Sequence, residues 1–187
     1  MALTKLDPQT ALIVVDLQKG IVGSVLAHPI EDVIERSRAL LAAFRQRALP
    51  VVLVNVAGAA PGRTERPPRM TTRPPGWTDF IPELDQQSDD IVVTKRTWGA
   101  FASTHLESTL RVRGVTQVVV AGVATGTGVE STARQAYEQG FNVTLAIDAM
   151  TDARPEAHEY SIKHVFPRLG ETGSTQEIID LLDTRSV

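Results

Sequence analysis

Residues 117–140 read QVVVAGVATGTGVESTARQAYEQG, and this stretch decides the fold. It opens with the apolar run 118–121, whose β-branched residues are typical of a buried strand. Small residues follow from Gly122 to Gly128, and apolar positions then recur at helical spacing as far as Gly140. A strand that leads into a helix through a glycine turn places backbone N–H groups at the carboxyl edge of a sheet. Ligands gather there in open α/β proteins.

Strands and helices are predicted to alternate along the rest of the chain. Other apolar runs predict buried strands at residues 11–15, 51–56, 91–94 and 142–147, and residues 170–174 read as a short edge strand. Helical patterns cover residues 29–48, 104–113, 155–166 and 176–183, and the helix after residue 128 is expected to bury Val129, Thr132, Ala133, Ala136 and Tyr137. This order predicts an α/β fold with three layers, α/β/α, in which a Rossmann-like open parallel sheet of five to six strands carries helices on both faces. Residues 1–187 are expected to form a single domain.

Composition narrows the class of protein. The 187 residues are 42% hydrophobic and 22% charged, which is typical of a globular domain with a sizeable core. A net charge of -3 gives no sign of nucleic-acid binding. The chain has no cysteine, which excludes disulfides, thiolate metal sites and a cysteine nucleophile. The apolar run at residues 11–15 is too short for a membrane span or a signal peptide, so we expect no membrane contact and a cytoplasmic location.

Polar residues follow the first and third predicted strands. Asp16 and Gln18 come directly after the first strand, and Lys95 ends the third. Because the carboxyl ends of parallel strands share one edge, Asp16 is a candidate acid or base and Lys95 a candidate partner. Trp98 and Phe101 could wall the site. The structural alternatives stay open: Asp16 could cap a turn, and Lys95 could lie at the surface above aromatic residues of the core.

Residues 58–77 form a long segment rich in proline and arginine. The prolines exclude regular structure, and a loop of this length is usually a lid, an interface segment or disordered. Its arginines can be solvated surface charges. Alternatively, Arg69 or Arg73 closes over an acidic ligand.

The motifs in this order resemble the isochorismatase-like hydrolases, a superfamily that includes the nicotinamidases and other cysteine amidohydrolases. The matching motifs are IVVDLQ (13–18), VVTKRTWGAF (92–101), AGVATGTGVESTARQAYEQG (121–140) and VTLAIDAMTD (143–152). The resemblance implies an Asp–Lys–Cys triad. Asp16 and Lys95 match its first two members, and Gly128 stands at the cysteine position.

The resemblance also bears on the surroundings of the site. It implies a cis peptide bond at Val123–Ala124 and assembly into a homodimer or tetramer, with the proline-rich loop as interface or lid. The nicotinamidase metal ligands, an Asp and two His after the second strand, are absent from residues 55–58. His158 and His164, six residues apart, do not share a helical face and are poor candidates for a metal pair. We therefore expect no catalytic metal and no cofactor.

Gly128 decides the expected mechanism. Without a thiolate, the covalent route through a thioester is closed, and the neighbouring Thr127 has no evident base to activate its hydroxyl. A branch of the superfamily, which contains isochorismatase proper and its phenazine-pathway relative, also has glycine here and hydrolyses a vinyl ether without a covalent enzyme intermediate. The resemblance to that branch implies that Asp16 protonates the vinyl carbon and that water attacks the resulting oxocarbenium-like carbon.

Several points stay open in the sequence. Lys95 should lower the pKa of Asp16 while burial should raise it, so the sequence does not decide whether Asp16 acts as an acid or a base. The substrate is expected to be small and carboxylated, with Lys95 or the loop arginines on its carboxylate. Val123, Ala124, Thr127 and Gly128 are expected to form the floor of its pocket. One alternative is a catalytically silent member that binds a small ligand or a protein partner. Another is a cysteine hydrolase in which Gly128 was engineered.

Overall fold

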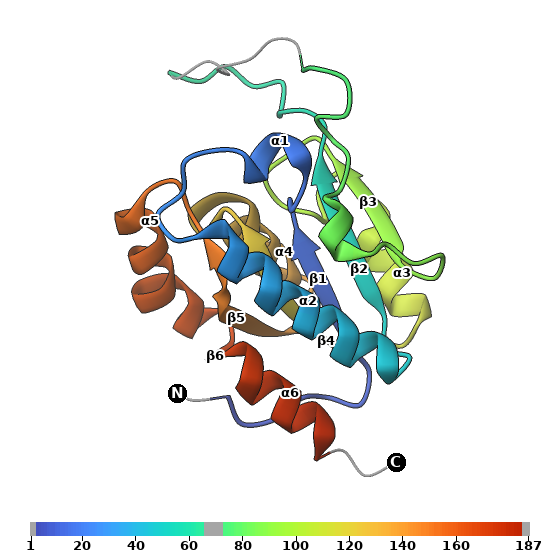
Figure 1. The fold of residues 1–187 in the computed structure, drawn as a ribbon. Helices are drawn as coiled ribbons and strands as arrows, with labels where there is room; N and C mark the ends of the chain where they lie inside the picture. Colours follow the sequence, from blue (N-terminus) through green and yellow to red (C-terminus); the bar gives the residue numbers. More distant parts are fainter. Residues whose placement is uncertain (1–2, 66–72, 185–187) are drawn as a thin grey trace.

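A six-stranded parallel sheet forms the centre of the molecule (Figure 1). The computed structural model describes residues 3–65 and 73–184. The strands are β1 (Thr10–Val15), β2 (Val51–Val56), β3 (Ile91–Lys95), β4 (Gln117–Val123), β5 (Asn142–Thr151) and β6 (Glu171–Gly173). Their spatial order is β3-β2-β1-β4-β5-β6. The chain therefore builds outward in one direction from β1 to β3 and then in the other from β4 to β6, so the order reverses between β1 and β4.

Helices cover both faces of this sheet, which confirms the predicted α/β/α arrangement. The α-helices are α1 (Lys19–Val22), α2 (Ile30–Gln46), α3 (Leu106–Val112), α4 (Glu130–Glu138), α5 (Pro155–Tyr160) and α6 (Thr175–Asp183). Short 3-10 helices are η1 (Pro82–Leu84) and η4 (Phe166–Arg168), and η2 (Thr125–Val129) and η3 (Ser161–Val165) are π-helical turns. In Figure 1, α2 and α6 lie in front of the sheet and α4 lies behind it.

Two apolar cores explain why the strands are uninterrupted hydrophobic runs. Ile13 and Val15 of β1 pack on the face covered by α3 and α4. Leu12 and Val14 pack on the face covered by α2 and α6. Because successive side chains of a strand point to opposite faces, a strand buried on both sides needs apolar residues at every position. All six residues of β1 are buried.

Three details differ from the sequence-based prediction. β5 continues beyond Ile147 to Thr151, past a register shift in its pairing with β4. The predicted helix at 155–166 ends in π and 3-10 turns, because Pro167 has no N–H to continue an α-helix. Tyr137, predicted to be buried, is 53% exposed, and Phe141 takes its place in the core.

The proline-rich loop leaves the carboxyl edge of the sheet. Figure 1 shows its described flanks rising above β2 and α1. Gln18, three residues after the end of β1, makes an isolated bridge to Phe80 beyond the loop. Within residues 3–65 and 73–184, no helix has the length and apolar character needed to cross a membrane.

Candidate active site

Asp16 and Lys95 form a buried ion pair at the carboxyl edge of the sheet. Asp16 follows β1, and Lys95 is the last residue of β3. The Lys95 Nζ donates to Asp16 Oδ2 over 2.7 Å, and the two side chains are only 2% and 8% exposed. Nζ also donates to the Thr97 carbonyl at 3.4 Å. The structure thus brings together the two residues that the sequence singled out on separate strands.

The backbone at Asp16 turns sharply as the chain leaves β1. Its φ is 54°, in the left-handed region that Asp tolerates better than most residues. Its N–H still donates to the Val54 carbonyl at 2.8 Å, which keeps the residue attached to β2. One carboxyl oxygen is left over: Asp16 Oδ1 is buried and has no hydrogen-bond partner among the described residues. A buried polar atom without a partner is uncommon and points to a bound water or ligand.

Burial dominates the electrostatics of Asp16. It raises the pKa of this carboxyl from 3.8 to about 6, against the opposing charge and hydrogen bond of Lys95. The sequence left the balance of these two effects open. With a pKa close to neutral, Asp16 exchanges its proton readily near physiological pH, as an acid or base catalyst requires.

Gly128 lies against this carboxyl. A Cβ atom added there would lie 3.2 Å from Asp16 Oδ2, 3.2 Å from the Val123 carbonyl oxygen and 3.1 Å from Val15 Cγ1. A side chain at position 128 would therefore start in contact with the Asp16 carboxyl. With glycine there, that carboxyl faces backbone instead of a side chain.

The turn that carries Gly128, residues 123–129, is closed by its own backbone. The Val123–Ala124 peptide bond is cis, as the resemblance implied. The N–H groups of Thr127 and Val129 both donate to the Ala124 carbonyl, each at 3.1 Å. The Thr127 hydroxyl has no hydrogen-bond partner among the residues described, so no base is in place to activate it.

Gly122, just before the turn, is required by the close approach of β1 and β4. Its φ is +114°, and a Cβ there would lie 2.1 Å from the Val15 carbonyl oxygen. No side chain fits at that distance. The glycine therefore lets β4 approach β1 at the point where Asp16 begins.

Gln18 is buried and bonded on every side by backbone. Its Nε2 donates to the carbonyls of Val56 and Trp77 at 3.2 and 3.1 Å, and its Oε1 accepts from the Val56 N–H at 2.7 Å. These bonds join the end of β1 to the end of β2 and to the chain that returns from the proline-rich loop. Contact between Gln18 and a substrate stays a prediction.

The remaining predicted residues are spread around the edge. Arg73 Nη1 donates to the Ala57 carbonyl at 2.6 Å, and its guanidinium lies 4.5 Å from the centre of the Trp77 ring. Trp98 is 68% exposed, whereas Phe101 is 5% exposed and belongs to the core. Arg69 lies outside the described residues.

Sequence reasoning missed two residues of α4 that hold the loop after β3. Thr132 Oγ1 accepts from the Ala100 N–H at 3.1 Å and donates to the Gly128 carbonyl at 2.7 Å. Gln135 Oε1 accepts from the N–H groups of Phe101 and the next residue, at 3.0 and 3.2 Å. The sequence did contain an indication of this role: both polar residues lie on or beside the face of the helix that packs on the core, where apolar residues are expected.

Metal ligation has no evident place in the described part of the chain. No three His, Asp or Glu side chains there are arranged to hold a metal ion. The two histidines of the 155–166 segment have different ring neighbours: His158 packs against His28 with ring centres 4.5 Å apart and planes tilted by 54°, and His164 packs near Tyr160.

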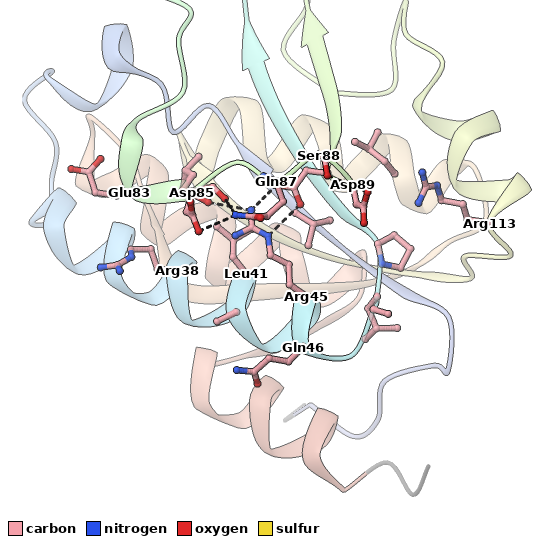
Figure 2. Close-up of a pocket in the computed structure, with 18 of the residues that line it drawn as sticks. Arg38, Leu41, Arg45, Gln46, Glu83, Asp85, Gln87, Ser88, Asp89 and Arg113 are labelled. Carbon is pink, nitrogen blue, oxygen red and sulfur yellow. Dashed lines mark hydrogen bonds and ion pairs between the residues drawn. The ribbon is translucent and has the colours of Figure 1, made fainter.

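A groove of about 1110 Å³ lies elsewhere, at the amino ends of β2 and β3 (Figure 2). Its lining includes Arg38, Leu41, Arg45, Glu83, Asp89 and Arg113. The Arg45 guanidinium pairs across it with Asp90, at 2.6 Å. Neither Asp16 nor Lys95 is part of this groove, so its size does not identify the site of chemistry.

Comparison with known proteins gives consistent matches. Residues 10–177 match the family model described as Isochorismatase domain. The chain is 40% identical over 180 residues to the uncharacterized isochorismatase family protein YecD of Escherichia coli O157:H7, covering 92% of this chain and 96% of that protein. It is 37% identical over 140 residues to streptothricin hydrolase of Streptomyces noursei, covering 74% of this chain and 48% of that protein. The solved structure of an isochorismatase family protein from Burkholderia thailandensis superposes with a TM-score of 0.92 at 39% identity, covering 96% of this chain and 98% of that one.

Proposed function

The chain belongs to the isochorismatase family of hydrolases, and from this we propose that it hydrolyses a small carboxylated molecule by non-covalent acid–base catalysis with Asp16 and Lys95. The reaction that fits best is cleavage of a vinyl ether. No cofactor and no metal take part in the proposed steps, which use only the residues described above and water.

One observation carries this proposal. Asp16 combines a pKa of about 6 with a buried carboxyl oxygen that has no partner in the described structure, and it lies next to a position without a side chain. A carboxyl group that has one oxygen without a hydrogen-bond partner, and that lies beside a position without a side chain, is suited to transfer a proton to a bound molecule. Gly128 removes the thiol that a covalent hydrolase needs at this position, and it leaves the acid in place.

The proposed hydrolysis consists of a proton transfer followed by the addition of water. Asp16, protonated, transfers its proton to the terminal vinyl carbon, and the neighbouring carbon becomes an oxocarbenium ion. Water adds to that carbon and returns a proton to Asp16, and the resulting hemiketal collapses to an alcohol and a carbonyl compound. Burial favours the neutral acid before transfer, and the Lys95 ammonium at 2.7 Å stabilises the carboxylate after it.

The turn at 123–129 supplies the floor of the proposed pocket. A Cβ at position 128 would meet both the Asp16 carboxyl and the Val123 carbonyl, and we expect the backbone of Val123, Ala124, Thr127 and Gly128 to line the pocket beside Asp16. The substrate carboxylate would bind to arginines of the proline-rich loop, Arg73 or Arg69, with Trp98 at the rim. The contacts of Arg73 support this proposal. Its guanidinium contacts the Ala57 carbonyl and the Trp77 ring, but it has no carboxylate partner in the described structure.

Further parts of the proposal concern assembly and location. We propose a homodimer or tetramer that works in the cytoplasm on a small-molecule substrate, without nucleic acid or membrane as a partner. The family assignment supports these points, and the molar mass of the protein in solution tests the first of them.

A panel of vinyl ethers, amides and carbamates tests the proposed reaction. We expect turnover of a carboxylated vinyl ether by the unchanged protein, and loss of that turnover in Asp16→Asn, which keeps the size of the side chain but removes the acid. The matched control is Asp79→Asn, because Asp79 forms an exposed ion pair with Lys19 at 3.0 Å. Turnover that persists in Asp16→Asn would contradict the assignment of chemistry to Asp16.

The alternative function is a silent family member that binds a ligand or a protein partner. It predicts that no compound of the panel is turned over although some bind. The presence of the Asp16–Lys95 pair counts against this alternative. Burying an ion pair costs desolvation free energy, and a site that only binds has no chemical need of the pair.

A further inference from the structure

The turn at residues 123–129 is attached to the rest of the protein by two side chains that the proposed chemistry does not use. Asp152 Oδ2 accepts from the Gly126 N–H at 2.8 Å. The Nδ1 of His158 and the Thr125 hydroxyl lie 2.8 Å apart, in hydrogen-bond contact. Asp152 comes directly after β5, and His158 lies on α5. Both contacts fall within three residues of Gly128.

These are strong attachments because they are shielded from water. Thr125, Asp152 and His158 are 0%, 3% and 9% exposed. The second oxygen of Asp152 accepts from the Arg154 N–H at 3.0 Å, which fixes the orientation of its carboxyl group. A charge-assisted hydrogen bond that a backbone N–H donates to a buried carboxylate is among the stronger hydrogen bonds in proteins.

Packing brings α5 close to the same turn. A Cβ added at Gly126 would lie 3.2 Å from Ala157 Cβ and 3.3 Å from Asp152 Oδ2. One residue beyond the turn, Glu130 Oε2 accepts from the Ser161 hydroxyl at 2.7 Å. Thr125, Gly126 and Glu130 therefore all contact the segment 152–161.

Other hydrogen bonds of the turn are local. The N–H groups at positions 127 and 129 donate to the Ala124 carbonyl, and the Gly128 carbonyl accepts from the Thr132 hydroxyl on the following turn of helix. In the described structure, Asp152 and His158 are the only residues more than four positions away that hydrogen-bond to residues 124–129. The position of Gly128 relative to the Asp16 carboxyl thus depends on β4 and on these two side chains.

We propose that Asp152 is a positioning residue of the active site, which acts with His158 to set where the turn places Gly128 against Asp16. The inference rests on the proposed function in one respect, that Asp16 and the turn enclose the reacting atoms. A displacement of about 1 Å in such a site can cost about a hundredfold in rate. The residue itself does not touch the substrate.

The test places a single thiol at position 128 and measures its reactivity. The chain has no cysteine, so a Gly128→Cys variant carries one thiol, and its alkylation by iodoacetamide is followed by mass. The rate between pH 5 and pH 10 gives the thiol pKa and reports how the thiol lies relative to Asp16 and Lys95. No substrate is needed, so the result stands whether or not Asp16 is the catalytic acid.

Variants at position 152 are made in that background. Asp152→Ala is expected to change the alkylation rate at pH 7 by about tenfold and to shift its pH profile, since the turn is free to move. Asp152→Asn keeps a carbonyl oxygen for the Gly126 N–H and should restore most of the original profile. Thr125→Val, which keeps the shape but loses the hydroxyl, should shift the profile in the same direction as Asp152→Ala.

Asp148→Ala is the matched control. Asp148 lies on β5, the strand that Asp152 follows, and accepts from the N–H and hydroxyl of Thr175 at 2.7 and 2.9 Å, so it anchors α6 instead of the turn. It should lower the melting temperature and leave the alkylation profile unchanged. Equal profiles for Asp152→Ala and Asp148→Ala would overturn the proposal, and so would an Asp152→Asn profile that matches Asp152→Ala.

Discussion

A side chain at position 128 would begin in contact with Asp16, because a Cβ atom there would lie 3.2 Å from Asp16 Oδ2. In an Asp–Lys–Cys triad, this is where the sulfur-bearing side chain would begin. Asp16 and Lys95 keep their ion pair at 2.7 Å, so the two supporting members are in place around a position without a nucleophile.

A thiol introduced at this position should be activated. In Gly128→Cys, the Lys95 ammonium and the start of the following helix favour the thiolate, so we expect a thiol pKa below the ordinary value of about 8.5. The added Cβ has three neighbours at 3.1 to 3.2 Å, so these must shift by a few tenths of an ångström. The measurement is the pH dependence of iodoacetamide alkylation, together with an assay for amide hydrolysis.

The control thiol for this experiment is Gly62→Cys. Gly62 is exposed, and a Cβ there meets nothing within 4 Å, so its thiol should titrate at the ordinary value. Equal pKa values for the two thiols would show that the Asp16–Lys95 pair does not act on position 128.

The pH dependence of activity should follow the protonation of Asp16. As a proton donor with a pKa of about 6, Asp16 loses its active form as the pH rises through that value, so kcat/KM should fall on the alkaline side. Lys95 lowers this pKa, so Lys95→Met should move the alkaline limb to higher pH. Lys19→Met, which removes an exposed lysine, should leave the limb in place. A limb that moves to lower pH in Lys95→Met would contradict this account.

The free energy of unfolding should also depend on the protonation of Asp16. The pKa of Asp16 rises from 3.8 in the unfolded chain to about 6 in the folded protein, so the folded state binds more protons and Asp16 favours folding most at low pH. That contribution is complete below pH 4 and is lost as the pH rises through 6. At 1.36 kcal/mol for each pKa unit, the loss is about 3 kcal/mol.

Asp16→Asn removes this titration. Urea unfolding of the two proteins at pH 4 and pH 7 should therefore show the variant gaining about 2 kcal/mol relative to the unchanged protein over that interval. Only the change with pH is diagnostic, because the variant also leaves the buried Lys95 without its partner at both pH values. A constant difference between the two proteins would show that Asp16 has an ordinary pKa.

The sequence predicted the sheet, and the edge of the sheet at which the candidate site lies, for a simple physical reason. Strands buried on both faces are continuous apolar runs, and the residues that follow them in a parallel sheet meet at one edge. Asp16 and Lys95 could therefore be placed together before their distance was known. The sign of the net effect on the pKa of Asp16 could not be predicted, because it depends on how deeply the carboxyl is buried.

Side-chain contacts across the sheet were beyond the reach of sequence patterns. The sequence did not indicate that the Gln18 amide bonds to the backbone of β2, and contact between Gln18 and a substrate stays a prediction. Phe101 lies in the core, one of the two placements that the sequence left open for it, and its role as a wall of the site stays a prediction. Asp152 stood within a matching motif, but nothing in its spacing indicated a bond to Gly126, since such a bond depends on the folded path of two distant segments.

Thr132 provides a test of how much the loop after β3 depends on α4. Its hydroxyl accepts from the Ala100 N–H at 3.1 Å and donates to the carbonyl four residues before it, at 2.7 Å. Thr132→Val keeps the shape but leaves a buried N–H without its partner, which should lower the free energy of unfolding by about 1–3 kcal/mol. Thr109 makes the same bond to the carbonyl four residues before it, at 2.8 Å, and its side chain makes no bond across the fold among the described residues. Thr109→Val should therefore cost clearly less in urea unfolding. Equal losses for the two variants would mean that the bond to Ala100 contributes nothing, and among the described residues the loop after β3 would then be held to α4 by Gln135 alone.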